Sequence, residues 1–129
     1  MNIKINSRDP VYIQVIQYFK EQIATGVLEP GQEISSRREL ANKLKINPNT
    51  AQRAYKEMEE QGLIFTEGNL PSRITKNEVI IKQVREELIL EAVNTFIASV
   101  QSINVPLEEA IGLIKKNYEK NPGGQEGNQ

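Results

Sequence analysis

The chain has 129 residues, of which 38% are apolar, with 16 basic and 17 acidic side chains. This length and composition supply one small core plus an appendage, and are thin for two independent cores. Without cysteine and histidine, the commonest zinc ligands, thiol nucleophiles and imidazole bases are excluded, so we predict no metal, no cofactor and no catalytic residue. No apolar run approaches the roughly 20 residues that span a bilayer. The N-terminus also lacks the apolar core of a signal peptide, so we expect a cytoplasmic protein that makes no membrane contact.

Charge is distributed unevenly along the chain. Residues 1–76 carry 11 basic and 9 acidic side chains, whereas residues 77–129 carry 5 and 8. Between Ser35 and Lys56 there are six basic side chains and only one acidic side chain. A local excess of positive charge is what a nucleic-acid phosphate backbone requires. We therefore expect nucleic-acid contact in the first part of the chain and a different task in the second.

The first predicted helix begins at Asp9 and Pro10. An aspartate can accept hydrogen bonds from the free amides of the first turn, and proline loses no hydrogen bond at the first helical position. Gly26 is a candidate for the residue that ends this helix. The apolar residues between these signals recur at spacings of 4, 3 and 4, as on one face of a helix: Tyr12, Ile16, Phe19 and Ile23.

A turn and a second helix follow. Residues 29–32 read Glu-Pro-Gly-Gln, a turn, and residues 33–35 are long enough only for a short strand. Ser36 and Glu39 have the spacing of a capping box, so the second helix begins at Ser36. Its first turn carries two basic residues and its length carries three apolar ones: Arg37, Arg38, Leu40, Ala41 and Leu44.

The third predicted helix is the one whose polar face fits a DNA major groove. Residues 45–47 form the turn before it, and Asn47-Pro48 repeats the helix-start signal. Helical spacing turns one set of residues inward and another outward, and Gly62 ends the helix. The inward set is Ala51, Ala54, Tyr55 and Met58, and the outward set is Asn49, Gln52, Arg53 and Lys56.

A hairpin completes the first domain. Residues 63–67 and 72–75 read as two strands, and residues 68–71, Gly-Asn-Leu-Pro, read as the turn between them. Three helices followed by a hairpin make a winged helix-turn-helix. We therefore predict a mainly α fold with a small β-wing, in which residues 1–76 form the DNA-binding domain.

From Asn77 the pattern becomes a long helix with a wide apolar surface. Five apolar residues from Ile89 to Ile103 repeat at 4, 3, 4 and 3, the spacing of a coiled-coil seam, and a second stripe lies beside them. One stripe can pack on the first domain, but two need a further partner. Residues 104–106 break this helix, and a last helix runs from Pro106 to about Lys120. We predict a helical dimerisation hairpin over residues 77–120 and a disordered tail over residues 121–129.

At this point the residues match a known family. The stretches PVYIQVIQYFKEQIATGVLEPGQEI, SSRRELANKL and INPNTAQRAYKEMEEQGLI, followed by two helices, occur in order at the expected separations. The chain is identified on these motifs as resembling the GntR family of bacterial winged helix-turn-helix regulators, and specifically its short YtrA-type subfamily, over roughly residues 8 to 120.

The resemblance implies a homodimeric transcription repressor that binds a palindromic operator, often of a transporter operon, and that dimerises through the C-terminal helical pair. It also implies that Arg38, the basic residue of the S-x-R-E-L-A run, contacts DNA. Pro48 and Gln52 stand where many relatives have arginine, which shifts base preference. Relatives commonly have a basic wing that lies in the minor groove, whereas residues 67–73 here carry one basic residue, Arg73, and the acidic Glu67.

The candidate sites follow from these patterns. Exposed arginines in a first helical turn are often merely solvated, but they oppose the helix dipole by roughly 0.3 to 1 kcal/mol, which favours a function. Amide and guanidinium groups can pair bidentately with base edges. The predicted DNA-binding residues are Arg37, Arg38, Lys45, Asn47, Asn49, Thr50, Gln52, Arg53, Lys56 and Arg73. The predicted dimerisation residues are Ile81, Val84, Leu88, Ile89, Val93, Phe96, Val100, Ile103, Leu107, Ile111 and Ile114.

Three alternatives stay open at the level of sequence. The winged helix could be a protein-interaction module whose apolar C-terminal helices bind another protein and whose basic face is incidental. An enzyme is disfavoured because paired carboxylates, metal-ligand clusters and a Gly-rich phosphate loop are lacking. A small-molecule effector is the third alternative, although we expect two short helices to be too small to enclose a pocket of roughly 300 to 1,000 Å³ within one subunit.

Overall fold

The computed structural model describes residues 3–120 and divides the chain into two compact units, Met1–Ile89 and Leu90–Gln129. The predicted disordered tail, residues 121–129, lies outside the described residues. Among residues 3–120, no helix combines the length and apolar character that crossing a membrane would require. The division at Ile89 falls within a long helix, C-terminal to the boundary after residue 76 that the sequence predicts.

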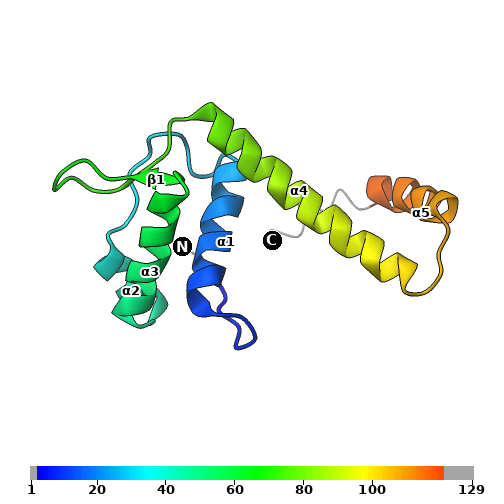
Figure 1. Cartoon of the computed structure of the whole chain (residues 1–129), viewed down its shortest axis with the longest axis horizontal. Helices are drawn as coiled ribbons and strands as arrows, with labels where there is room; N and C mark the ends of the chain where they lie inside the picture. Colours follow the sequence, from blue (N-terminus) through cyan, green and yellow to red (C-terminus); the bar gives the residue numbers. More distant parts are fainter. Residues whose placement is uncertain (1–2, 121–129) are drawn as a thin grey trace. The chain divides into compact units, whose positions relative to one another are not determined.

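The first unit contains three helices, a small hairpin and the start of a fourth helix (Figure 1). The helices are α1 (Val11–Ala24), α2 (Arg37–Leu44) and α3 (Pro48–Glu60). The strands β1 (Ile64–Phe65) and β2 (Arg73–Ile74) pair antiparallel, with Ile64 opposite Ile74. The predicted mainly α fold with a small β-wing is confirmed.

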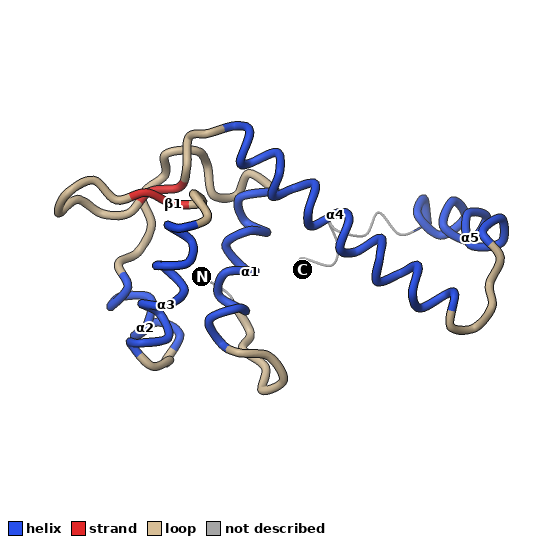
Figure 2. The backbone as a smooth tube through the Cα atoms, in the orientation of Figure 1, coloured by secondary structure: helices blue, strands red, loops and turns tan. Residues whose placement is uncertain are grey.

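The strands are shorter than the sequence predicts. The side-chain hydroxyls of Thr66 and Ser72 bond to each other at 2.6 Å, and between them the chain leaves the ladder to form the wing loop, residues 66–72. Figure 2 shows this loop extending beyond the two short strands. The strand predicted at residues 33–35 is reduced to a single bridge between Glu33 and Arg73.

The predicted start of the first helix is wrong in one respect, because Asp9 does not cap it. Pro10 occupies the cap position of α1 and no side chain accepts a hydrogen bond there. Instead, Gln14 Nε2 donates to the backbone carbonyls of Asn6 and Asp9 at 2.9 and 2.8 Å. Asn6 Oδ1 accepts from the backbone N–H groups of Arg8 and Asp9. The segment before α1 is therefore a turn fastened to the helix, and Asp9 contributes its backbone to that turn.

The capping signals of α2 and α3 are confirmed. Ser36 Oγ accepts from the backbone N–H of Glu39, and the Glu39 carboxylate accepts from the backbone N–H of Ser36. These hydrogen bonds lower the pKa of Glu39, so their contribution to stability is lost as the pH falls through that lowered pKa. Asn47 Oδ1 accepts from the N–H of Asn49 at 2.7 Å, with Pro48 in the first turn.

Replacing Ser36 by alanine should lower the free energy of unfolding by about 1 kcal/mol, because one side of the reciprocal cap is lost. Urea unfolding followed by circular dichroism measures this change. Ser99→Ala is a suitable control, since Ser99 is exposed in the last turn of a helix and caps no helix start. Equal stability of the Ser36→Ala variant and the wild type would contradict a stabilising role for the cap.

The core of the first unit is built around α3, which packs against α1, α2 and β1. All four residues that the sequence turns inward are buried, and the Tyr55 and Phe19 rings meet edge to face at 6.1 Å. Gly26 and Gly62, which follow α1 and α3, have φ values of +79° and +76°, a conformation that glycine adopts without strain. The largest fully buried side chains are Tyr55, Phe19, Leu40, Met58, Leu63, Ile74 and Val15.

The long helix α4 (Glu78–Gln101) begins in the first unit and continues into the second. Asn77 Oδ1 accepts from the N–H of Val79 at 2.9 Å at its start. Val84 is only 4% exposed and belongs to the core of the first unit, and Ile81 and Leu88 pack against that core. These three residues are among those the sequence assigns to dimerisation. Val84 is buried and the other two are half-buried, so all three contribute to the core of their own subunit, and their part in dimerisation stays a prediction.

The second unit consists of the rest of α4 and the helix α5 (Leu107–Lys120). The chain breaks between them where predicted, and Asn104 there adopts a left-handed conformation with φ +58°. Ala110 is 5% exposed. The large apolar residues that remain exposed in this unit are Leu90, Val93, Phe96, Ile97, Ile103, Leu107, Leu113, Ile114 and Tyr118.

Candidate nucleic-acid interface

The outward face of α3 is polar and accessible. Asn49, Gln52 and Lys56 are exposed, and Thr50 is half-buried. Asn47 uses its side-chain oxygen to cap the helix, which leaves only its amide nitrogen for another partner. The sequence therefore placed the exposed residues correctly, and the structure gives Asn47 a capping role in addition.

The start of α2 adds positive charge beside this face. Arg38 is exposed and makes no hydrogen bond or ion pair among residues 3–120. Lys45 is also exposed; it follows α2 directly and has a left-handed backbone conformation. A groove of about 560 Å³ separates the start of α2 from the wing, and Arg38 and Leu70 both line it. This part of the surface can attract an anionic backbone.

Arg53 lies in a position that the sequence pattern does not reveal. Its guanidinium carbon is 3.7 Å from the centroid of the Tyr12 ring, and its Nη2 donates to Tyr12 Oη at 2.9 Å. Its Nε is 3.7 Å from the Glu57 carboxylate. Sequence reasoning assigned Tyr12 to the core stripe, and nothing local links two residues 41 positions apart. The side chain of Arg53 remains 60% exposed, so it presents a fixed and accessible cation.

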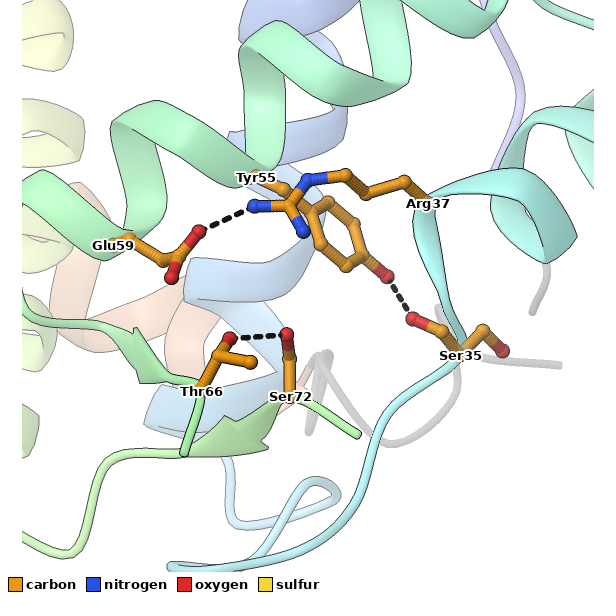
Figure 3. A network of polar contacts seen from close by, with 6 residues as sticks. All are labelled: Ser35, Arg37, Tyr55, Glu59, Thr66 and Ser72. Atoms are coloured by element: carbon orange, nitrogen blue, oxygen red, sulfur yellow. Dashed lines mark hydrogen bonds and ion pairs between the residues drawn. The ribbon is translucent and has the colours of Figure 1, made fainter. Parts of the chain in front are cut away.

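Two other predicted DNA contacts have partners within the first unit. Arg37 forms an ion pair with Glu59 and lies over the Tyr55 ring (Figure 3). Arg73 Nη1 donates to the carbonyl of Gly31 at 2.9 Å, and its Nη2 is 3.4 Å from the Glu33 carboxylate. Each of these two arginines is therefore neutralised by an acid.

The wing carries no positive charge at its tip. Residues 67–71 are all exposed, and Leu70 is 59% exposed. Figure 3 shows the Thr66–Ser72 bond that closes the base of the loop. A loop with Glu67 as its charged residue gains nothing from phosphate attraction. The tip of the wing therefore adds no cation to those of α2 and α3.

The second unit presents two apolar grooves. One of about 470 Å³ is lined by Val93, Phe96 and Leu107 among others, and a second of about 540 Å³ is lined by Phe96, Ile103 and Ile114 among others. Of the predicted dimerisation residues outside the core, six are exposed and two are half-buried. The exposed six are Ile89, Val93, Phe96, Ile103, Leu107 and Ile114, and the half-buried two are Val100 and Ile111.

Three helices, a two-stranded wing and a polar third helix flanked by accessible cations define a winged helix-turn-helix DNA-binding regulator. The model of the family described as "Bacterial regulatory proteins, gntR family" matches residues 11–74. The chain belongs to this family and is of its short YtrA type. It is thus a transcription regulator and not an enzyme.

Similar proteins support this identification over nearly the whole chain. The HTH-type transcriptional repressor YtrA of Bacillus subtilis is 32% identical, and the match covers 97% of each chain. The structure of a GntR family transcriptional regulator from Listeria monocytogenes is 33% identical, with a TM-score of 0.81, over 87% of this chain and 98% of that one. A transcriptional regulator from Oenococcus oeni is 32% identical, with a TM-score of 0.74, over 90% and 97% of the two chains.

Proposed function

We propose that the protein is a repressor that binds a palindromic operator as a homodimer. The observation that carries the proposal is the polar face of α3 beside the accessible cation of Arg38. In this proposal Gln52, Asn49 and Arg53 reach base edges, because amide and guanidinium groups pair bidentately with adenine and guanine. Thr50 and the amide of Asn47 contribute further polar groups. Arg38, Lys45 and Lys56 contact phosphates and supply the affinity that is independent of sequence.

The exposed apolar surface of the second unit supports self-association. Phe96 is 40% exposed, and Leu107 and Tyr118 are 70% and 77% exposed. Soluble monomers rarely leave large contiguous apolar patches in water. A second copy that covers this surface would hold two DNA-binding heads together, with half-sites about one helical turn, roughly 34 Å, or a multiple of it apart. The short YtrA type favours a transporter operon as the target, and a protein that acts on the chromosome is expected in the cytoplasm.

A small-molecule effector has weaker support. The two grooves of the second unit have volumes typical of ligand pockets, roughly 300 to 1,000 Å³. Ligand pockets, however, usually place a few polar groups among their apolar walls to orient the ligand. The 470 Å³ groove is lined by apolar residues apart from Gln101. A second copy of the chain explains such a surface better than a polar metabolite does.

Selection of bound sequences from random duplex DNA tests the proposal. The purified protein at about 0.1 M salt should recover an inverted repeat, because a two-fold symmetric dimer reads two identical half-sites. Recovery of no motif, with binding that is lost steeply as salt rises, would contradict sequence-specific function. A monomeric or polydisperse mass in light scattering would then favour the alternative, a module whose apolar helices bind another protein.

A further inference from the structure

Arg37 differs from the other basic residues of α2 and α3 because it is half-buried, whereas the others are exposed. Its Nη2 pairs with the Glu59 carboxylate, and the two side chains are only 32% and 33% exposed. Its guanidinium carbon lies 5.3 Å from the centroid of the Tyr55 ring. Its Nε is buried and has no hydrogen-bond partner among residues 3–120. Figure 3 shows the guanidinium between the ring and the carboxylate.

The partners of Arg37 come from one face of α3. Tyr55 and Glu59 are four residues apart, so their side chains lie one turn apart on the same side of the helix. Tyr55 Oη also donates a hydrogen bond to the backbone carbonyl of Ser35, directly before the cap of α2. Burial raises the pKa of Tyr55 and keeps the phenol protonated for this bond. Two successive turns of α3 therefore hold both the backbone and the first side chain at the start of α2.

This arrangement opposes a direct phosphate contact by Arg37. A phosphate would have to compete with the Glu59 carboxylate, which already pairs with the guanidinium. The neighbouring residue, Arg38, is exposed and has no such partner in the described part of the chain. Because Arg38 follows Arg37 directly, the interactions that hold Arg37 also set the direction in which Arg38 leaves α2.

We propose that Arg37 is a positioning residue for DNA recognition: with Glu59 and Tyr55 it holds the start of α2 against α3, so that Arg38 and the α3 face meet one operator together. The proposal rests on the proposed function and deepens it. Arg37 then contributes to the choice between operator and other DNA, and not to the number of phosphates bound. A residue that contacts phosphate instead strengthens binding to all sequences and leaves the preference for the operator unchanged.

The test compares Arg37→Met, Glu59→Gln and the double variant on two duplexes. One duplex carries the site recovered by selection, and the other has the same bases in shuffled order. Arg37→Met should lower the ratio of the two affinities about fivefold to tenfold, the effect of removing one interaction from a coupled unit. Glu59→Gln should lower it similarly. The double variant should lower it no further than either single change, because both remove the same pair.

The second measurement is the affinity for the shuffled duplex at several salt concentrations. The logarithm of affinity falls with the logarithm of salt concentration by about 0.9 for each phosphate contact. Arg37→Met should leave this slope at the wild-type value, whereas Arg38→Ala should reduce it. Glu60→Gln is the matched control, because Glu60 adjoins Glu59 and is exposed. It removes the same charge and should leave the affinity ratio unchanged.

Three outcomes would overturn the proposal. The first is a reduced salt slope for Arg37→Met, which would make Arg37 a phosphate contact. The second is an unchanged affinity ratio in Arg37→Met, which would make the ion pair incidental. The third is a ratio lowered as much by Glu60→Gln as by Glu59→Gln. If Arg37→Met fails to fold in urea titrations, the near-isosteric Glu59→Gln decides by the same ratio. A wild-type protein without preference for either duplex would instead contradict the proposed function.

Discussion

Replacing Phe96 by glutamate is expected to yield monomers with poor operator affinity. Phe96 lines both apolar grooves of the second unit, and in a two-fold dimer each substitution occurs twice. A loss of about 2 kcal/mol per protomer, typical of an aromatic anchor, raises the dimer dissociation constant roughly a thousandfold. Separate heads also lose the effective concentration that linkage provides, so operator affinity should fall by about 10²- to 10⁴-fold. Light scattering and DNA titration measure the two effects.

Two controls separate this effect from unfolding and from added charge. Asn94→Glu introduces the same charge two residues away, on the opposite side of α4. Asn94 lines neither groove. This variant should remain dimeric. Val84→Ala removes buried methyl groups from the core of the first unit and should lower the free energy of unfolding by about 2 kcal/mol. The mass measured by light scattering should remain that of the dimer. A Phe96→Glu variant that remains dimeric would mean that the self-association surface lies elsewhere.

Replacing Arg38 by alanine is expected to weaken binding to operator and shuffled DNA alike. A hydrogen bond to a charged group contributes about 1.5 to 3 kcal/mol, so the affinity at about 0.1 M salt should fall roughly tenfold to a hundredfold for each of the two protomers that loses one. The salt slope should also become shallower, by about 0.9 for each phosphate that the variant no longer binds. Fluorescence anisotropy at several salt concentrations measures both quantities.

Arg85→Ala is the matched control for Arg38→Ala. Arg85 is an exposed arginine of α4 in the same unit, and it makes no ion pair among the described residues. Its removal changes the net charge equally but should leave the salt slope almost unaltered. An unchanged slope for Arg38→Ala would remove Arg38 from the phosphate contacts, and an equal decrease for Arg85→Ala would mean that the DNA-binding face extends to α4.

The order of elements and the inward face of α3 could be predicted from local sequence signals. Ser36 and Glu39 cap α2, Asn47 caps α3, and Gly26 and Gly62 follow helix ends, as expected. These signals act over a few residues, because a cap bonds amides of its own first turn and glycine relieves strain at its own position. Helical periodicity likewise depends only on neighbouring turns, so it identified the buried residues of α3 correctly.

The partner of each functional side chain could not be predicted in this way. Tyr12 and Arg53 meet across 41 residues, Arg37 and Glu59 across 22, and Arg73 and Glu33 across 40. A count of basic residues does not show that acids from distant segments pair with Arg37 and Arg73. Asp9 similarly failed as a cap because Asn6 and Gln14 organise the turn around it.

The two apolar stripes of α4 show most clearly the difference between what the sequence determines and what the packing of the folded chain determines. Both have helical spacing, and nothing in either stripe says which one stays inside the subunit. The structure buries Val84 in the core around α3, whereas Phe96 remains exposed. Local chemistry thus determined the helices, their ends and the family of the protein. Packing between distant segments decided which charges and which apolar faces remain accessible, because burial and ion pairing depend on neighbours that the order of residues does not specify.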